Sequence, residues 1–422
     1  MSSTLRGGGN AGLTVNSSMK DLVESFIWAS SRARSWVQTG RDAAYLPSYW
    51  AGLPERPMFY SRDLAHQMLG AHLLGLDTEN LAMLRHFAAS ATERRGWYPL
   101  WAFEFTGEPA AIDYRSDDDF VRETPAPFEL VEKAVEQFRW TGDDRFLRTP
   151  EIAAFIRSTT TVFVETHDPL GTGVAGTASN KDFFAGIATY NEVEEPPYLQ
   201  VAGDGIASQW AAYEALGIKN DLSEQFERDW WLPAERHYAA GFTADGPVTG
   251  FRKESSWFPA VKGLIRENAD AHLEFLSDGL RDDPPHNIEA YTYLPEAFLR
   301  YGWDAQALRW IRHLAASRSD YPEVSFTHVA HVAVGLTGLE PGDAAGEVRT
   351  RSHLPGGDWL EANGIPLAGS VLGVRHEGRE SSELWVTDGP GVTWTAFEGT
   401  TVHVPSGSRA RAYADGRVKK GK

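Results

Sequence analysis

Amphipathic helical periodicity from Ser18 to about Glu340 constrains the fold of this chain more than any other feature. Apolar residues recur at i, i+3 and i+4, and most of these segments end at Gly or Pro, as helices commonly do. Gly142, Gly217 and Gly302 follow three of the segments in the manner of C-caps. The predicted helices are 19–38, 63–76, 79–90, 127–141, 150–167, 205–216, 222–240, 268–280, 288–301, 304–317 and 326–336.

The connections between these helices alternate in length. Short turns join neighbouring helices at 76–78, 141–144 and 302–303. Long loops lie between the pairs, at 98–125, 168–203, 241–267 and 281–287. Loops of this length inside a compact domain usually carry function. The number of helices is close to what six hairpins need. The alternation of short and long connections therefore predicts a mainly α fold. This fold is an (α/α)6 toroid of helical hairpins, whose long loops form a pocket at one mouth.

Alternating, Gly-rich segments replace the helical pattern after Pro341. They predict short strands and hence a small C-terminal β-sheet, at 370–375, 382–387, 392–397 and 401–404. The expected domains are a flexible N-terminal tail (1–17), the helical barrel (18–340), a β-rich segment (341–415) and a basic tail (416–422).

The composition excludes several classes of function. The 422 residues include no cysteine, which excludes disulfides, thiolate metal sites and cysteine nucleophiles. A formal net charge of −18 argues against nucleic acid or an anionic membrane as a partner, and it disfavours polyanionic substrates. No apolar run of ~18 residues is long enough to span a membrane. The N-terminus lacks an export signal, so we expect a cytoplasmic protein.

Arg62 and Asp63 open an apolar helix directly after Phe59 and Tyr60. A carboxylate at a helix start accepts backbone N–H groups and complements the helix dipole, so a capped core helix is one interpretation. The other is a sugar clamp, in which Asp63, oriented by Arg62, holds two adjacent hydroxyls. In either case the neighbouring guanidinium should keep Asp63 ionised.

Three further carboxylates lie in or beside the long loops. Glu192 follows Tyr190 and Asn191 in an acidic run, where crowding raises the pKa of a carboxyl group. Asp204 lies between two glycines at a helix start, and Glu289 lies in the first turn of a later helix. Each has a structural alternative. Glu192 could lie in a solvated acidic loop, Asp204 could be an N-cap, and Glu289 could complement the helix dipole.

Other candidates are weaker. Glu254 has basic neighbours that could simply pair with it, and the run 117–119 cannot turn three aspartates toward one ion. His66 and His72 lie on different faces of one helix, and His328 and His331 lack an evident third ligand. The sequence has no phosphate-binding loop, dinucleotide fingerprint or nucleophile elbow. We therefore predict no catalytic metal and no cofactor.

Two segments resemble the six-hairpin glycosidases, the (α/α)6-barrel superfamily of glucoamylases and trehalases. The stretch 59–65, Phe-Tyr-Ser-Arg-Asp-Leu-Ala, is similar to the aromatic–Arg–Asp stretch that grips the sugar in glucoamylase-like enzymes. The stretch 203–210, Gly-Asp-Gly-Ile-Ala-Ser-Gln-Trp, resembles the trehalase-type segment that carries the general acid, with Gln209 where that segment has Arg. The resemblance implies Asp204 or Glu192 as the acid and Glu289 as the base.

The implied activity is inverting, exo-acting hydrolysis of a neutral glycoside or short oligosaccharide by a carboxylic acid and a carboxylate. Arg62, Asp63, Asn191 and Asn287 would contact hydroxyls. The walls would come from Tyr60, Trp97, Trp101 and Tyr291. Alternatives on the same toroid are a polysaccharide lyase, an unsaturated-uronide hydrolase, or a sugar epimerase using His286, His328 or His331. A non-catalytic carbohydrate-binding protein is a further alternative, and the oligomeric state stays open.

Overall fold

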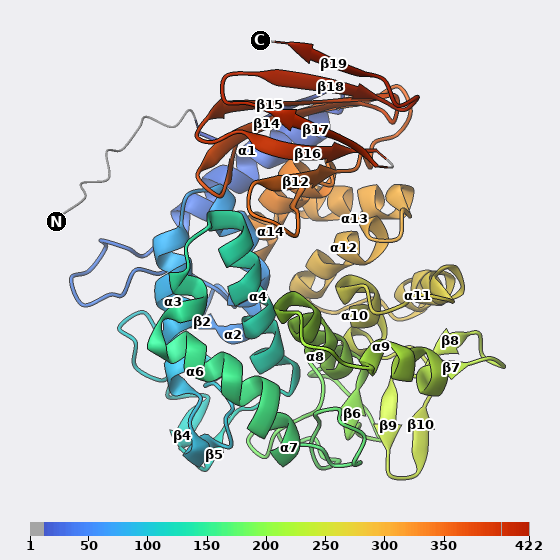
Figure 1. Ribbon diagram of the computed structural model, residues 1–422. Helices are drawn as coiled ribbons and strands as arrows, with labels where there is room; N and C mark the ends of the chain where they lie inside the picture. Colours follow the sequence, from blue (N-terminus) through green and yellow to red (C-terminus); the bar gives the residue numbers. More distant parts are fainter. Residues whose placement is uncertain (1–11, 398, 422) are drawn as a thin grey trace. The chain divides into compact units, whose positions relative to one another are not determined.

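The computed structural model describes residues 12–397 and 399–421 (Figure 1). These residues form two compact units. The larger unit comprises 27–139 and 143–331. The smaller unit comprises the described residues up to Phe26, residues 140–142, and the chain from Val332 onward. No helix among the described residues is long and apolar enough to cross a membrane.

Helices dominate the larger unit, and most of them lie where the periodicity predicts them. They are α2 (Ser61–Leu73), α3 (Asp77–Ser90), α4 (Pro125–Thr141), α5 (Arg145–Arg148), α6 (Pro150–Ser158), η2 (Thr159–Phe163), α7 (Val164–Thr166), α8 (Gly203–Leu216), α9 (Leu222–Gln225), η3 (Phe226–Trp230), α10 (Glu254–Lys262), α11 (Ala269–Asp282), η4 (Ile288–Tyr293), α12 (Leu294–Leu299), α13 (Asp304–Ser317) and α14 (Pro322–Ala330). Helix α1 (Lys20–Ser35), the end of helix α4 and the π-helical segment η5 (His331–Gly335) each span a boundary between the units.

Two segments depart from the predicted pattern. The helix expected over 222–240 ends at Trp230, and two short strands follow it, β7 (Trp231–Leu232) and β8 (His237–Tyr238). Helix α10 lies inside the expected loop 241–267. All of its residues are buried, so it has no polar face to give a helical period, and Pro259 interrupts its interior.

Short strands position the start of α2. Strand β2 (Met58–Tyr60) pairs with β3 (Ala102–Glu104), with Phe59 opposite Phe103. The backbone N–H of Ser61 then donates to the carbonyl of Trp101. The chain therefore turns from a paired strand directly into the helix that carries Arg62 and Asp63.

Buried polar contacts tie the helices of the larger unit together. Asn80 of α3 is fully buried, accepts the hydroxyl of Tyr49 (2.6 Å), and donates to the Met68 carbonyl of α2 (2.9 Å) and to Gln137 of α4 (3.1 Å). Lys262 of α10 forms ion pairs with Glu129 (2.5 Å) and Glu132 (2.6 Å) of α4. Because buried polar groups are costly unless paired, these contacts specify how the helices pack.

Helix α2 packs closely against α14. A Cβ atom on Gly70 would lie 2.0 Å from the carbonyl oxygen of Phe326, so the two backbones touch where a side chain would stand. The first helix that lies wholly in the larger unit thus contacts the last such helix, about 250 residues further along the chain.

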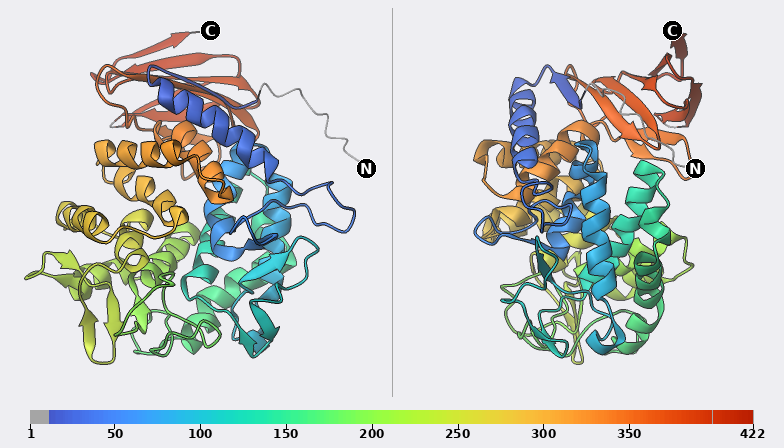
Figure 2. Two further views of the ribbon diagram at one scale, coloured as in Figure 1. Left: turned by 180° about the vertical axis from the view of Figure 1, so that it is seen from behind. Right: turned by 90° about the vertical axis from the view of Figure 1, so that its left-hand side faces the viewer.

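Strands form the smaller unit (Figure 2). One sheet has the order β1-β13-β14-β15-β18-β19, and the other has the order β11-β12-β16-β17. The bounds are β1 (Thr14–Ser17), β11 (Glu340–Pro341), β12 (Glu347–Thr350), β13 (Trp359–Leu367), β14 (Ser370–Glu377), β15 (Ser381–Asp388), β16 (Val392–Ala396), β17 (Thr400–Val404), β18 (Arg409–Tyr413) and β19 (Val418–Gly421).

Both ends of the described chain are more ordered than the sequence predicts. Thr14–Ser17, expected in a flexible tail, pair with β13, and Val418–Gly421, expected in a basic tail, pair with β18. The first eleven residues of that expected N-terminal tail lie outside the described residues. Edge strands are held by backbone hydrogen bonds, which leave little trace in a hydrophobic pattern.

We predict that Gly70→Ala destabilises the larger unit by about 1–3 kcal/mol, because the added methyl group overlaps the Phe326 carbonyl. Gly205→Ala is the matched control. Its Cβ would lie 3.5 Å from the carbonyl oxygen of Ala188, an ordinary van der Waals contact, so we expect unchanged or slightly higher stability. Urea unfolding followed by tryptophan fluorescence measures the unfolding midpoints of both variants. Equal midpoints for the two variants would contradict the close helix contact.

Candidate functional site

An open pocket lies in the larger unit. Its lining comes from the starts of helices and the loops before them. The lining residues are Arg62, Tyr190, Asn191, Glu192, Val193, Lys253, Glu254, Pro285, His286, Asn287, Glu289 and Ala290. The structure thus gathers five of the residues that the sequence nominates, namely Arg62, Asn191, Glu192, Asn287 and Glu289.

The buried guanidinium of Arg62 is the central charge of this pocket. It forms an ion pair with Glu289 (2.7 Å) and donates to the backbone carbonyl of Tyr190 (3.2 Å). Glu192 is a second, longer partner at 3.7 Å, and its side chain is 39% exposed. Burial raises the pKa of Glu192, and Arg62 opposes that effect. One cation therefore holds two carboxyl groups and a loop backbone around a single space.

Glu254 is the pocket residue that the sequence analysis ranked too low. It is the first residue of α10 and is buried at the pocket wall. Burial raises the pKa of Glu254 to about 8, against the opposing effect of Arg62. A carboxyl group in this environment stays protonated near neutral pH and can donate a proton. Like Asp204 and Glu289, Glu254 begins a helix, but the sequence predicted a loop over 241–267 and so did not reveal this helix start.

The backbone just before Glu254 is strained. Lys253 has a φ of 51° and a ψ of −119°, which favour glycine over a residue with a side chain. Its ammonium group lies 3.4 Å from Asp283. Strain of this kind is retained where the surrounding structure fixes a functional side chain.

Asp204 lies beneath the pocket and does not line it. It is fully buried in α8 and accepts the backbone N–H of Tyr190 (2.5 Å) and the hydroxyl of Thr189 (2.9 Å). Burial raises the pKa of Asp204 to about 6, and the Tyr190 and Thr189 hydrogen bonds oppose that rise. In this position Asp204 holds the loop that carries Asn191 and Glu192.

Asp63 has a different environment from the one expected. Its carboxyl group accepts the hydroxyl of Tyr321 (3.3 Å), and one of its oxygens lies within 4.8 Å of oxygens of Glu289 and Glu323. Burial, then Glu323 and Glu289, raises the pKa of Asp63 well above its usual range, and Arg62 does not offset this. The expectation that Arg62 keeps Asp63 ionised is therefore wrong. Successive helix residues point about 100° apart, so Arg62 and Asp63 face different partners.

The predicted aromatic walls lie elsewhere. Tyr60 and Trp101 pack on each other edge to face (5.0 Å), and the Trp101 indole donates to Glu123 (2.7 Å). Tyr291 packs against Trp310 (5.6 Å) and His313 (4.8 Å). Trp97 is half-buried. None of Tyr60, Trp97, Trp101 and Tyr291 is among the described residues that line the pocket.

Of the histidines considered for an epimerase, His286 lines the pocket. His328 and His331 are buried and are not among its lining residues. The arrangement therefore offers carboxyl chemistry in the pocket, with one histidine at its rim.

Several solved structures of known proteins resemble the structure of this chain. The sequence matches no family model and no curated protein. A rhamnosidase of family GH78 from Bacillus sp. GL1 has a TM-score of 0.64 at 15% identity, over 92% of this chain and 43% of the rhamnosidase. A candidate kojibiose phosphorylase from the human microbiome has a TM-score of 0.62 at 6% identity, over 97% of this chain and 67% of the other.

A rhamnosidase from Dictyoglumus thermophilum has a TM-score of 0.54 at 12% identity, over 92% of this chain and 45% of that one. The chain therefore spans less than half the length of either rhamnosidase. The resemblance to the six-hairpin glycosidases is confirmed at the level of the fold.

We predict that Asp204→Ala lowers the free energy of unfolding by about 1–3 kcal/mol, because it leaves the buried Tyr190 N–H without its acceptor. Asp204→Asn keeps an acceptor oxygen and should cost less. Urea unfolding of both variants measures the difference. If both variants keep full stability and Asp204→Asn alone abolishes turnover, Asp204 is the acid that the sequence resemblance implies.

Proposed function

We propose that this protein is a glycoside hydrolase that cleaves a neutral glycoside or short oligosaccharide in the pocket around Arg62. The observation that carries the proposal is the gathering of Glu192, Glu254 and Glu289 around one buried guanidinium. Glycoside hydrolysis needs one protonated carboxyl group and one carboxylate that flank the scissile bond.

The two roles follow from the two environments. Glu254 is the general acid in this proposal, because its pKa of about 8, raised by burial, keeps it protonated near neutral pH. Glu289 is the general base in this proposal, because its ion pair with Arg62 (2.7 Å) fixes the position of its carboxylate in the pocket. Glu192, the most exposed of the three, contacts substrate hydroxyls together with Asn191 and Asn287.

The pocket favours an uncharged sugar. Exo-action on a short substrate, which the sequence resemblance implies, is part of the proposal. Three carboxyl groups in the lining disfavour an acidic sugar. The amides of Asn191 and Asn287 supply neutral donors and acceptors.

The proposal includes the (α/α)6 toroid and the inverting course. Contact between α2 and α14 joins an early and a late helix of the larger unit, which supports a closed ring of hairpins. The matched structures are named for enzymes that act on carbohydrates, which supports the same class here. Inversion needs room for a water molecule between sugar and base, with carboxyl groups ~6.5–9.5 Å apart.

We predict that Glu254→Gln lowers kcat/KM for unactivated glycosides by about 10²–10⁴-fold, because the amide cannot donate a proton. A panel of aryl glycosides identifies the substrate. The loss should shrink for dinitrophenyl glycosides, whose leaving group needs no proton. In the unmodified enzyme, kcat/KM should fall as the pH rises through about 8, and Glu254→Gln should abolish this alkaline limb.

Glu123→Gln is the matched control for that experiment. Burial also raises the pKa of Glu123 to about 8, but Glu123 binds the Trp101 indole and is not among the lining residues. We expect its kcat/KM to stay within about threefold of the unmodified enzyme. Sugar binding without turnover across the panel by the unmodified protein would contradict a hydrolase.

We predict that Glu289→Gln removes turnover of activated and unactivated glycosides alike, by about 10²–10⁴-fold, because both need an activated water molecule. Proton NMR of the first product formed by the unmodified enzyme should show inversion at the anomeric carbon. Retention of configuration would instead assign Glu289, or another pocket carboxylate, as a nucleophile. Turnover of Glu289→Gln within a few-fold of the unmodified enzyme would exclude Glu289 as the base.

A further inference from the structure

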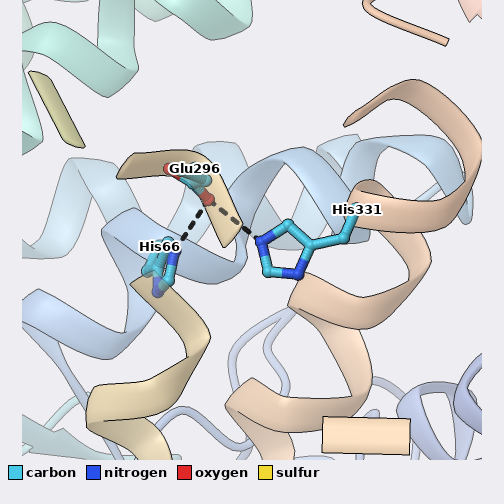
Figure 3. A group of neighbouring side chains, drawn as sticks. All are labelled: His66, Glu296 and His331. Atoms are coloured by element: carbon cyan, nitrogen blue, oxygen red, sulfur yellow. Dashed lines mark hydrogen bonds and ion pairs between the residues drawn. The ribbon is translucent and has the colours of Figure 1, made fainter. Parts of the chain in front are cut away.

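We propose that His66, Glu296 and His331 form a binding site for a divalent transition-metal ion, with zinc as the ion that best fits their chemistry. His66 Nε2 lies 2.9 Å from Glu296 Oε1, and His331 Nε2 lies 3.3 Å from the same oxygen. The three donor atoms all lie within 4.8 Å of one another. Figure 3 shows both imidazole rings directed at this one carboxylate from separate helices.

The spacing of the donors suits an ion among them. Tetrahedral zinc with bonds of ~2.0–2.1 Å holds its ligand atoms roughly 3.3–3.5 Å apart. The two distances to Glu296, 2.9 and 3.3 Å, therefore need to widen by only a few tenths of an ångström. Two imidazoles and one carboxylate are a common set of protein ligands for zinc, with the fourth position left to water.

His66 also has the outer partner that metal-binding histidines usually have. Its Nδ1 lies 2.6 Å from Glu323 Oε1, and Thr292 donates to that same oxygen (3.0 Å). The His66 ring stacks on Tyr293 with ring centroids 3.7 Å apart and planes tilted by 11°. A carboxylate that binds the second imidazole nitrogen fixes the tautomer and strengthens the ligand, and the stacked ring fixes its plane.

The surrounding charge favours a cation. Without a metal ion, each nitrogen of His66 faces a carboxylate oxygen, so hydrogen bonding to both requires two protons on one buried ring. Glu323 also lies close to Asp63 and Glu289. Two basic groups near these carboxyls already have partners. Arg62 is paired with Glu289, and Lys133, which interacts with Glu296, is paired with Glu136 (2.5 Å). A divalent ion would replace the proton between His66 and Glu296 and offset this excess of buried carboxyl groups.

The site is accessible from one side and is separate from the sugar pocket. The side chains of His66 and His331 are 4% and 3% exposed, whereas that of Glu296 is 34% exposed. None of the three is among the residues that line the pocket around Arg62. The ion would link α2, α12 and η5, which are far apart in the sequence. Its primary effect is therefore on the stability of the larger unit, independent of the proposed hydrolysis.

The test uses the 422-residue chain, stripped with a chelator and then titrated with zinc or cobalt(II) chloride. We expect one ion per chain by elemental analysis and a Tm that rises with the logarithm of free zinc. Cobalt should give the intense visible absorption of a tetrahedral site. Binding of fewer than about 0.2 ions per chain, with no rise in Tm and no cobalt spectrum, would overturn the proposal.

Variants locate the ion. His331→Ala and Glu296→Gln should abolish the cobalt spectrum, and Glu323→Gln should weaken zinc binding by about 10–100-fold through the loss of the outer partner. His72→Ala is the control, because His72 lies on the same helix and pairs with Asp77 (2.7 Å) outside the site. Unchanged binding in a folded His331→Ala variant would place the ion elsewhere. If His331→Ala does not fold, the folded Glu323→Gln variant decides by its zinc affinity.

Discussion

The buried ion pair between Arg62 and Glu289 is the interaction on which the functional half of this molecule depends. It joins α2 to η4 across 227 residues of sequence, and both side chains are 9% exposed. Removing water from two charges is expensive, and their attraction offsets that cost only when further hydrogen bonds complete the arrangement. The Tyr190 carbonyl supplies one such bond. Loss of either partner would leave an uncompensated buried charge, at a cost of about 3–5 kcal/mol.

Acidic side chains recur at helix starts in this part of the molecule. Asp63, Asp204, Glu254 and Glu289 each lie in the first turn of a helix. A helix N-terminus carries partial positive charge and free N–H groups, which stabilise a nearby carboxylate. A carboxyl group at a helix start can therefore be buried at lower cost. Their environments differ enough that Glu254 is held protonated while Glu289 pairs with a cation.

The sequence predicted much of the helical pattern and five pocket residues, because both depend on local signals. Helix periodicity needs only an apolar stripe, and Arg62, Asn191, Glu192, Asn287 and Glu289 lie in loops or at helix starts that stand out by composition. Glu254 was ranked too low because α10 is buried on every side and has no stripe to mark it. The true partners of Asp63 were equally hidden, since Tyr321 and Glu323 lie about 260 residues away.

Arg62 and His66 lie four residues apart on α2 and therefore on one face of that helix, one turn apart. The first turn of the helix carries Arg62, whose guanidinium enters the pocket, and the next turn carries His66, the proposed metal ligand. Between them, Glu289 pairs with Arg62, and Glu323 pairs with His66 while lying within 4.8 Å of Glu289. An ion bound at His66 would fix α2 against α12 and η5. The ion would therefore stabilise the helix that carries Arg62, while the contacts of Arg62 with Glu289 and the Tyr190 carbonyl hold the pocket without it.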